Sequence, residues 1–228
     1  PAEEVRIFTL QVVDYLMQFR PKLIVIACNT ATAVAIDEIR ARVDIPVIGV
    51  ITPGARAAIK TTRSGVIGVI GTEGTVRSKA YDKALMGISP HLRIISCACP
   101  ALVPLVESGQ YSSREEAIAA VRDCLKPIRA ADPDMDCLIL GCTHYPFLRE
   151  HIQEVMGRRV SLISSAEETA REISTVLYHK GLLERDLRRP VHQFMCSGNP
   201  ELFRHIAGQW LNAEIKVNPV VWQVTRIG

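Results

Sequence analysis

Two cysteines occupy matching places in this 228-residue sequence. Cys28 and Cys142 each follow a short apolar run and one small residue, and two polar residues come after each of them. Most free cysteines are small core residues. At the end of a buried strand, however, the backbone amides of a following helix stabilise a thiolate and lower the thiol pKa. The pair therefore suggests two acid–base groups acting on opposite sides of one small molecule.

The residues next to these cysteines carry groups that suit a small acidic substrate. Asn29 and Thr30 follow the first cysteine, and Thr143 and His144 follow the second. Their amide and hydroxyl groups are able to bind a carboxylate. A lone histidine is more often structural, but beside a thiol His144 could tune the thiol or share its protons.

A glycine-containing segment, Gly-Thr-Glu-Gly-Thr at 71–75, follows a third apolar run. It has neither the Gly-Lys-Ser/Thr ending of a Walker loop nor the GxGxxG pattern of a dinucleotide-binding loop. Its backbone amides could hold an anion such as a carboxylate. The alternative is a plain tight turn in which Thr72 or Thr75 caps the next helix.

Glu107 is a weaker candidate. It precedes Ser108 and Gly109. It is either a solvated loop carboxylate or a group that assists the acid–base residues without contacting the substrate itself. The serine pair at 164–165 reads first of all as a helix cap.

The remaining cysteines do not form a metal-binding pattern. Cys97 and Cys99 are closer together than the ligands of a structural zinc site, and no histidine cluster follows them. Cys124 and Cys137 lie inside a predicted helix and a predicted strand, so we interpret them as core residues. No metal and no cofactor are expected.

The composition is that of a globular protein, with 48% hydrophobic and 22% charged residues. A net charge of +3 argues against a nucleic-acid or membrane-surface function. No apolar run is long enough to span a bilayer, and Glu3 and Glu4 make the N-terminus unlike a signal peptide. Seven scattered cysteines suggest no disulfide framework, so a reduced, cytoplasmic protein is expected.

Short β-branched runs alternate with helical patterns along the chain. After an opening helix, strands are expected at 23–26, 46–50, 66–70, 92–96, 136–140, 160–163 and 193–196, with 215–224 as a candidate last strand. Helices are expected at 31–42, 55–61, 76–86, 114–130, 147–156 and 200–210, and another runs from a Ser165–Glu168 cap to about 180. A Ser113–Glu116 capping box is predicted to start the 114–130 helix.

The alternation of strands and helices predicts an α/β fold with parallel sheets. Every candidate loop lies at a strand's carboxyl end, where such folds bind ligands. The two cysteine segments are also a weak repeat, which suggests two similar halves facing each other across a cleft.

Five segments together resemble the glutamate racemase family, within the cofactor-independent aspartate/glutamate racemase superfamily. They are IACNTATA, LGCTHYP, VIGVITPGARAA, IGVIGTEGTVRS and ISSAEETA, and the resemblance covers nearly the whole chain. It implies two flavodoxin-like parallel-sheet domains related by a pseudo-twofold axis, with the active site in the cleft between them. The first domain would comprise 1–50 plus 164–228, and the second 51–163.

The resemblance also implies an activity, the interconversion of L- and D-glutamate without PLP or metal. Cys28 and Cys142 would be the acid–base pair, and His144 and Glu107 would assist proton transfer. The expected substrate-binding residues are Asn29, Thr30, Thr72, Thr75, Thr143 and His144. The product would supply peptidoglycan synthesis in the cytoplasm. A homodimer is expected, and neither nucleic acid nor membrane is an expected partner.

The family pattern begins with a strand ending in Asp-Ser and continues with a Pro-Tyr-Gly motif. Neither matches a position here, so we expect the first domain to lack that strand, and those roles are assigned to no residue. Two alternatives stay open. Aspartate or hydantoin racemases of the same superfamily would use the same cysteine pair, although His144 after Thr143 favours glutamate by resemblance. The other alternative is a truncated, non-catalytic binding module.

Overall fold

The computed structural model describes residues 1–184, 186 and 189–221. The chain divides into two compact units, Pro1–Leu183 and Glu184–Gly228, which are described separately below. Strands and helices alternate as the sequence predicts, and every strand pairing given below is parallel. The predicted division at residues 50 and 164 stays a prediction.

The first unit holds both cysteine segments. Its strands are β1 (Ile24–Ile26), β2 (Val47–Gly49), β3 (Val66–Gly71), β4 (Arg93–Ala98), β5 (Cys137–Gly141) and β6 (Ser161–Ser164). Its α-helices are α1 (Ala2–Met17), α2 (Asn29–Arg42), α3 (Ile51–Thr61), α4 (Glu73–Ser78), α5 (Ala80–Ile88), α6 (Leu102–Glu107), α7 (Arg114–Ala131), α8 (Arg149–Met156) and α9 (Ser165–His179). Two short 3₁₀ helices, η1 (Gln110–Ser112) and η2 (Tyr145–Leu148), complete it.

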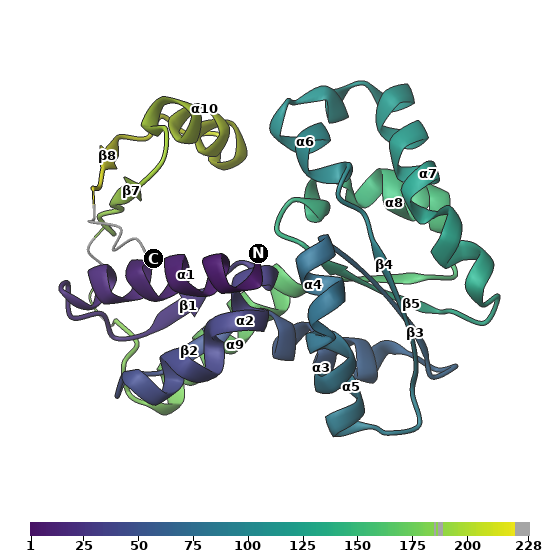
Figure 1. Cartoon of the computed structure of the whole chain (residues 1–228), viewed down its shortest axis with the longest axis horizontal. Helices are drawn as coiled ribbons and strands as arrows, with labels where there is room; N and C mark the ends of the chain where they lie inside the picture. The colour runs from purple at the N-terminus through teal and green to yellow at the C-terminus, as the bar shows by residue number, and fades with distance from the viewer. Residues whose placement is uncertain (185, 187–188, 222–228) are drawn as a thin grey trace. The chain divides into compact units, whose positions relative to one another are not determined.

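Two parallel sheets organise this unit. One contains β1 and β2, and the other has the strand order β4-β3-β5-β6 (Figure 1). In the larger sheet Gly71 pairs with Gly141, so β3 and β5 end side by side. The Cys142 segment and the 71–75 segment therefore leave the same edge of this sheet.

The larger sheet is covered on both faces, which explains why its central strands are continuous apolar runs rather than alternating ones. All residues of β3 and β5 are buried. On one face, Ile67 and Ile139 pack with Ala55 of α3 and Leu85 of α5. On the other face, a side chain at Gly68 would meet the ends of Met135, Leu138 and Ile128, the last of which belongs to α7.

The smaller sheet packs against α1 and α2. Ile24 and Ile26 point into a core that includes Leu10 and Val13 of α1 and Ile39 of α2. Between these two strand residues Val25 stays 37% exposed, so the other face of β1 is open among the described residues.

The second unit is small. A parallel pair, β7 (Phe194–Cys196) and β8 (Val217–Pro219), flanks α10 (Pro200–Leu211). The Asn199 side chain caps α10 by accepting from the backbone N–H groups of Glu201 and Leu202. The last three positions of the candidate strand at 215–224 lie outside the described residues.

Two helix predictions are wrong in their bounds. α3 begins at Ile51 rather than near residue 55, because Pro53 falls in the first turn, where its missing N–H costs no hydrogen bond. The helix expected at 76–86 is two helices, separated at Lys79, whose φ of 56° ends α4. α4 also begins three residues earlier than predicted, at Glu73.

The predicted helix caps differ in outcome. Thr72 caps α4 by accepting from the Thr75 N–H, as one of the two alternatives predicted. Ser113 precedes α7 but makes no side-chain capping bond, so the predicted box with Glu116 is wrong. α9 is capped by Ser164 rather than Ser165, because the Ser165 hydroxyl donates instead to the Leu140 carbonyl. No helix in the described part of the chain has the length and apolarity needed to cross a membrane.

The close approach of β3 and β5 makes Gly141 a stability-determining position. A Cβ there would lie 2.7 Å from the Ile70 carbonyl oxygen, which is backbone and cannot move aside easily. We expect Gly141→Ala to lower the free energy of unfolding by about 1–3 kcal/mol. The control Gly87→Ala, in α5 with open space around it, should raise it by up to about 1 kcal/mol. Urea unfolding midpoints measure both, and equal shifts of the two variants would contradict this account.

Candidate active site

Both singled-out cysteines lie at carboxyl ends of parallel strands, as predicted. Cys28 follows β1 and is the N-cap residue of α2, so its side chain lies at a helix N-terminus. Cys142 follows β5 directly. Cys28 is exposed, whereas Cys142 is 6% exposed. The two thiols therefore differ in their access to solvent.

The surroundings of Cys142 act on its protonation in opposite directions. Burial is the largest effect and raises the pKa of the Cys142 thiol above its ordinary value. The charge of Cys28 raises the pKa of Cys142 further, so the two thiols are near enough to interact. The backbone N–H groups of His144 and Tyr145 and the Thr143 hydroxyl lower it. These donors surround the sulfur where a thiolate would form.

A hydroxyl cluster joins the first cysteine segment to the 71–75 segment. Thr30 Oγ1 lies 2.8 Å from Thr72 Oγ1 and 3.1 Å from Thr75 Oγ1, and the latter two lie 3.1 Å apart. Gly74 permits this approach, because a Cβ there would lie 2.8 Å from the Thr30 methyl group. The structure thus brings together three residues that the sequence analysis took from two separate segments.

His144 links the second cysteine to Glu107. Its Nδ1 lies 3.6 Å from Cys142 Sγ and 3.3 Å from Thr143 Oγ1, while its Nε2 lies 2.9 Å from Glu107 Oε1. A proton on Nε2 donates to the carboxylate and leaves Nδ1 facing the thiol as an acceptor. Glu107 ends α6 and is partly solvated, so this chain of groups reaches from the buried sulfur to solvent.

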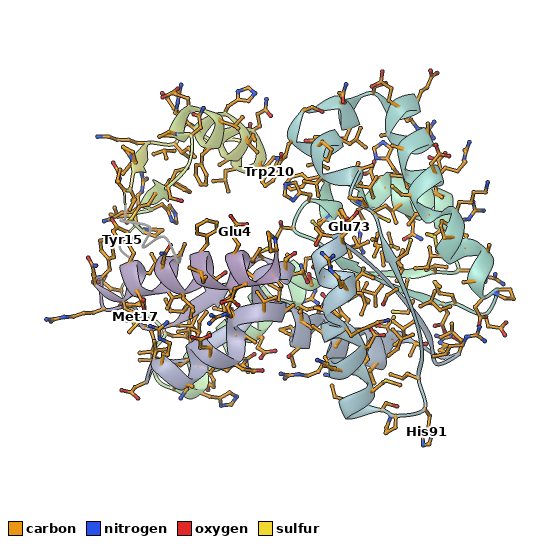
Figure 2. All side chains as sticks on the ribbon, viewed as in Figure 1. Glu4, Tyr15, Met17, Glu73, His91 and Trp210 are labelled. Atoms are coloured by element: carbon orange, nitrogen blue, oxygen red, sulfur yellow. The ribbon has the colours of Figure 1, made fainter. Side chains whose placement is uncertain are left out.

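Asn29 is buried beside Cys28, and its partner was not predicted. The Tyr81 hydroxyl donates to Asn29 Oδ1 over 2.7 Å. Tyr81 lies in the first turn of α5 with no motif around it, so only the apolar periodicity of that helix, which marks residue 81 as inward-facing, could have pointed to it. His91 lies between α5 and β4, at the edge of the larger sheet away from the carboxyl ends of its strands. Glu73, at the start of α4, lies at the opposite edge (Figure 2).

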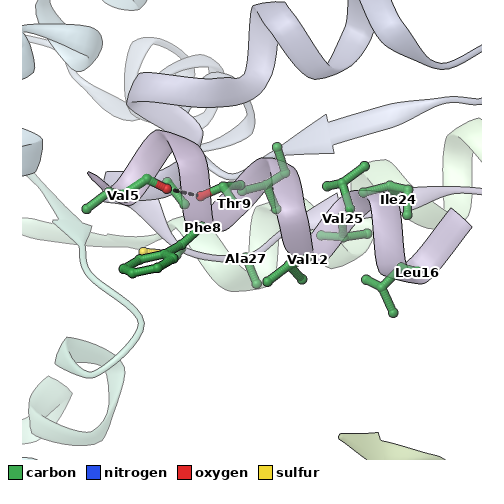
Figure 3. Close-up of a pocket in the computed structure, with 12 residues that line it drawn as sticks. Val5, Phe8, Thr9, Val12, Leu16, Ile24, Val25 and Ala27 are labelled. Carbon is green, nitrogen blue, oxygen red and sulfur yellow. Dashed lines mark hydrogen bonds between the residues drawn. The ribbon is translucent and has the colours of Figure 1, made fainter. Parts of the chain in front are cut away.

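An apolar groove of about 330 Å³ runs between α1 and β1, with Cys28 among its lining residues (Figure 3). Phe8, Val12 and Val25 line it, and no charged side chain of the described chain does. Thr9 also lines the groove, but its hydroxyl already donates to the Val5 carbonyl. The groove therefore does not suit a carboxylate, whereas the hydroxyl cluster offers polar groups that do.

The other cysteines play no visible part in this site. Cys137 is fully buried, as predicted, whereas Cys124 is only partly buried. Cys97 Sγ and Cys99 Sγ each donate a weak hydrogen bond to the Cys124 carbonyl. No group of three or more potential metal ligands gathers among the described residues.

Comparison with known proteins gives consistent matches. A family model described as Asp/Glu/Hydantoin racemase matches residues 2–173. Glutamate racemases from Bacillus cereus and Oceanobacillus iheyensis are 48% and 51% identical, over 94% and 90% of this chain and 78% and 74% of theirs.

Solved structures match over almost the whole chain. A glutamate racemase isoform from Bacillus anthracis is 46% identical with a TM-score of 0.92, and covers 97% of this chain and 82% of its own. A Francisella tularensis glutamate racemase solved with D-glutamate is 28% identical with a TM-score of 0.88, over 97% of this chain and 81% of its own.

The different burial of the thiols predicts an order of alkylation. Only thiolates react rapidly, so iodoacetamide should label exposed Cys28 first. Cys142 should react slowly at neutral pH and faster as pH rises, because a raised pKa keeps it protonated at neutral pH. Cys137 is the control: it is fully buried and its pKa is raised to about 12, so it should stay unlabelled. Peptide mass spectrometry measures all three, and early labelling of Cys137 would refute this order.

Proposed function

The chain belongs to the Asp/Glu/hydantoin racemase family, and we propose that within it the chain is a glutamate racemase that interconverts L- and D-glutamate. The observation that carries the proposal is the placement of Cys28 and Cys142 at carboxyl ends of strands, near enough for their charges to interact. The glutamate racemases at about half sequence identity support the choice of substrate.

The chemistry explains why two thiols are needed. The α-hydrogen of an amino acid is very weakly acidic, and inversion requires that a proton leave one face and another arrive at the opposite face. A thiolate removes the first proton while a thiol delivers the second, so the pair must hold opposite protonation states. After each turnover these states have been exchanged.

The burial of Cys142 suits it to proton removal. Because its pKa is raised, its thiolate is a stronger base than an ordinary one once it forms. Hydrogen-bond donors in a poorly solvated site also stabilise negative charge more strongly than water would. Cys142 takes the proton from L-glutamate, and Cys28 supplies the new proton from the other side.

The hydroxyl cluster and its neighbours hold the substrate. Thr30, Thr72 and Thr75 offer three hydroxyls at one point, and hydroxyls can turn their protons towards a carboxylate. Asn29 and Thr143 add an amide and a further hydroxyl for the second carboxylate and the amine. No PLP or metal takes part in this proposal.

His144 and Glu107 return Cys142 to its starting protonation state. The imidazole contacts the thiol on one side and the carboxylate on the other, so it can pass a proton between Cys142 and solvent. In the cell the product D-glutamate supplies peptidoglycan synthesis in the cytoplasm, and the enzyme acts as a homodimer.

Isotope incorporation tests the two-base mechanism. In deuterium oxide, product formed early from L-glutamate should carry deuterium at Cα while unreacted substrate stays largely unlabelled, because the donor thiol exchanges with solvent. Cys28→Ser should lower kcat by at least about 10²-fold, since a hydroxyl is a much weaker acid than a thiol. The matched control Cys196→Ser, in the second unit, should stay within about twofold. NMR measures the deuterium at Cα, and circular dichroism measures the rate of racemisation of each variant.

Four outcomes would reject the proposal or parts of it. Early product that keeps its original hydrogen would rule out two bases. A Cys28→Ser variant with a near-normal rate would remove Cys28 from the chemistry. Faster turnover of aspartate or a hydantoin than of glutamate would favour another member of the family, and glutamate binding without turnover would favour a binding module.

The His144–Glu107 contact predicts a separate effect. Glu107→Gln keeps the shape but removes the charge that stabilises a protonated imidazole, so transfer to His144 of the proton that Cys142 has taken from L-glutamate should slow. We expect kcat to fall about 10-fold or more with KM within about threefold. Glu154→Gln, on an exposed pair with Arg114, is the control and should behave as wild type. A normal kcat for Glu107→Gln would remove Glu107 from the proposed relay.

A further inference from the structure

Tyr81 contacts residues next to both cysteines, although it belongs to neither cysteine segment. It is 2% exposed, and its hydroxyl donates to Asn29 Oδ1, one residue after Cys28. Its ring lies against Gly141, one residue before Cys142, where an added Cβ would come within 3.0 Å of Tyr81 Cε2. One buried side chain therefore supports both strand ends.

The side-chain amide of Asn29 has a hydrogen-bond partner for its oxygen but none for its nitrogen. It is 3% exposed, Oδ1 accepts from Tyr81, and Nδ2 is buried without a hydrogen-bond partner. Buried donors are rarely left unpaired, and those that are call for a functional explanation. The unpaired N–H group belongs to the residue that follows Cys28 in the sequence, and the proposed function assigns this residue to the substrate site.

The orientation of this amide decides what it can bind. Nδ2 donates and attracts a carboxylate, whereas Oδ1 only accepts and would repel one. A tyrosine hydroxyl that donates to Oδ1 fixes which end remains for the ligand. Burial raises the pKa of Tyr81 above its ordinary value, so the phenol keeps its proton throughout the neutral and mildly alkaline range.

We propose that Tyr81 is a positioning residue for substrate binding: its hydroxyl holds the Asn29 amide so that Nδ2 is presented to a carboxylate of the substrate. The inference rests on the proposed function in that the substrate is glutamate. Tyr81 itself touches no reacting atom and acts through Asn29.

The competing explanation is that Tyr81 is only a core residue. Tyr145 provides a matched comparison, because it is also fully buried and its hydroxyl donates to a carbonyl, that of Cys99, over 2.8 Å. Removing either hydroxyl deletes a buried hydrogen bond of similar length, and the Tyr81 hydroxyl also interacts with the Ser165 side chain. Only the Tyr81 hydroxyl bonds to a side chain of the proposed substrate site.

The first test is a kinetic double-mutant cycle of Tyr81→Phe and Asn29→Ala in the full chain. Tyr81→Phe should raise KM about 10-fold, the loss expected for one misdirected hydrogen bond, with kcat within about threefold. L- and D-glutamate have equal free energies, so kcat/KM must fall equally in both directions. In the Asn29→Ala background, Tyr81→Phe should add less than about twofold, because no amide remains to orient.

Tyr145→Phe is the control for this cycle. Its fold-change in kcat/KM should be the same in the wild-type and Asn29→Ala backgrounds. Thermal unfolding should show comparable destabilisation for the two phenylalanine variants. The proposal is overturned if Tyr81→Phe also acts independently of Asn29→Ala, or if Tyr81→Phe leaves KM unchanged.

A second readout does not depend on activity. The sequence has four asparagines, Asn29, Asn199, Asn212 and Asn218, so ¹⁵N-asparagine labelling gives a simple side-chain amide spectrum. The Asn29 pair is assigned by its loss in Asn29→Ala. Tyr81→Phe should shift this pair and speed its hydrogen exchange, whereas Tyr145→Phe should not.

The two readouts separate failure of the inference from failure of the proposed function. If the wild-type chain neither binds nor racemises glutamate, the proposed function fails whatever the amide spectrum shows, and the substrate role of Tyr81 fails with it. If the wild type racemises glutamate but the Asn29 signals are the same in Tyr81→Phe, the positioning role alone is wrong.

Discussion

The contact of Thr30 with Thr72 and Thr75 is the interaction on which the site depends. It joins the start of α2, after the smaller sheet, to the start of α4, after the larger sheet. Each sheet alone presents one thiol at its carboxyl edge. A reaction on both faces of one carbon requires the two edges to be held together, and this contact lies where they meet. Gly74 is part of the same constraint, since any side chain there would separate the threonines.

The two thiols are similar in sequence context but not in environment. Cys28 is exposed at a helix N-terminus, while Cys142 is buried and surrounded by donors from the next three residues. A symmetrical reaction is thus carried out by an asymmetrical pair. Only the buried thiol has the His144–Glu107 connection to solvent, which matches its greater need for a proton path.

Local patterns in the sequence were sufficient for the strands and for the positions of both cysteines. A buried parallel strand is a short apolar run, and its carboxyl end is marked by the residue types that follow. The cap of α9 was misplaced by one residue, because Ser164 and Ser165 are equivalent locally and only the Leu140 carbonyl, distant in sequence, distinguishes them. The start of α3 was misplaced for a different reason: a proline was interpreted as a terminator although it suits the first turn of a helix.

Contacts between distant segments were harder to predict. Resemblance suggested a role for Glu107, but its distance to His144 spans 37 positions that no local pattern connects. Tyr81 was missed because a tyrosine in an amphipathic helix is ordinary core material. Its importance depends on a hydrogen bond to a residue 52 positions away.

The hydroxyl cluster has a further consequence for ligand exchange. Three hydroxyls carry three protons, and three mutual hydrogen bonds arranged as a closed ring use all of them. Such a ring is electrically neutral and offers no proton to an arriving anion. A carboxylate can bind only by breaking at least one of these bonds, and its departure lets the ring close again. The bonds among the three hydroxyls therefore compete with any bound anion, which limits how tightly the anion is held and favours rapid release of product.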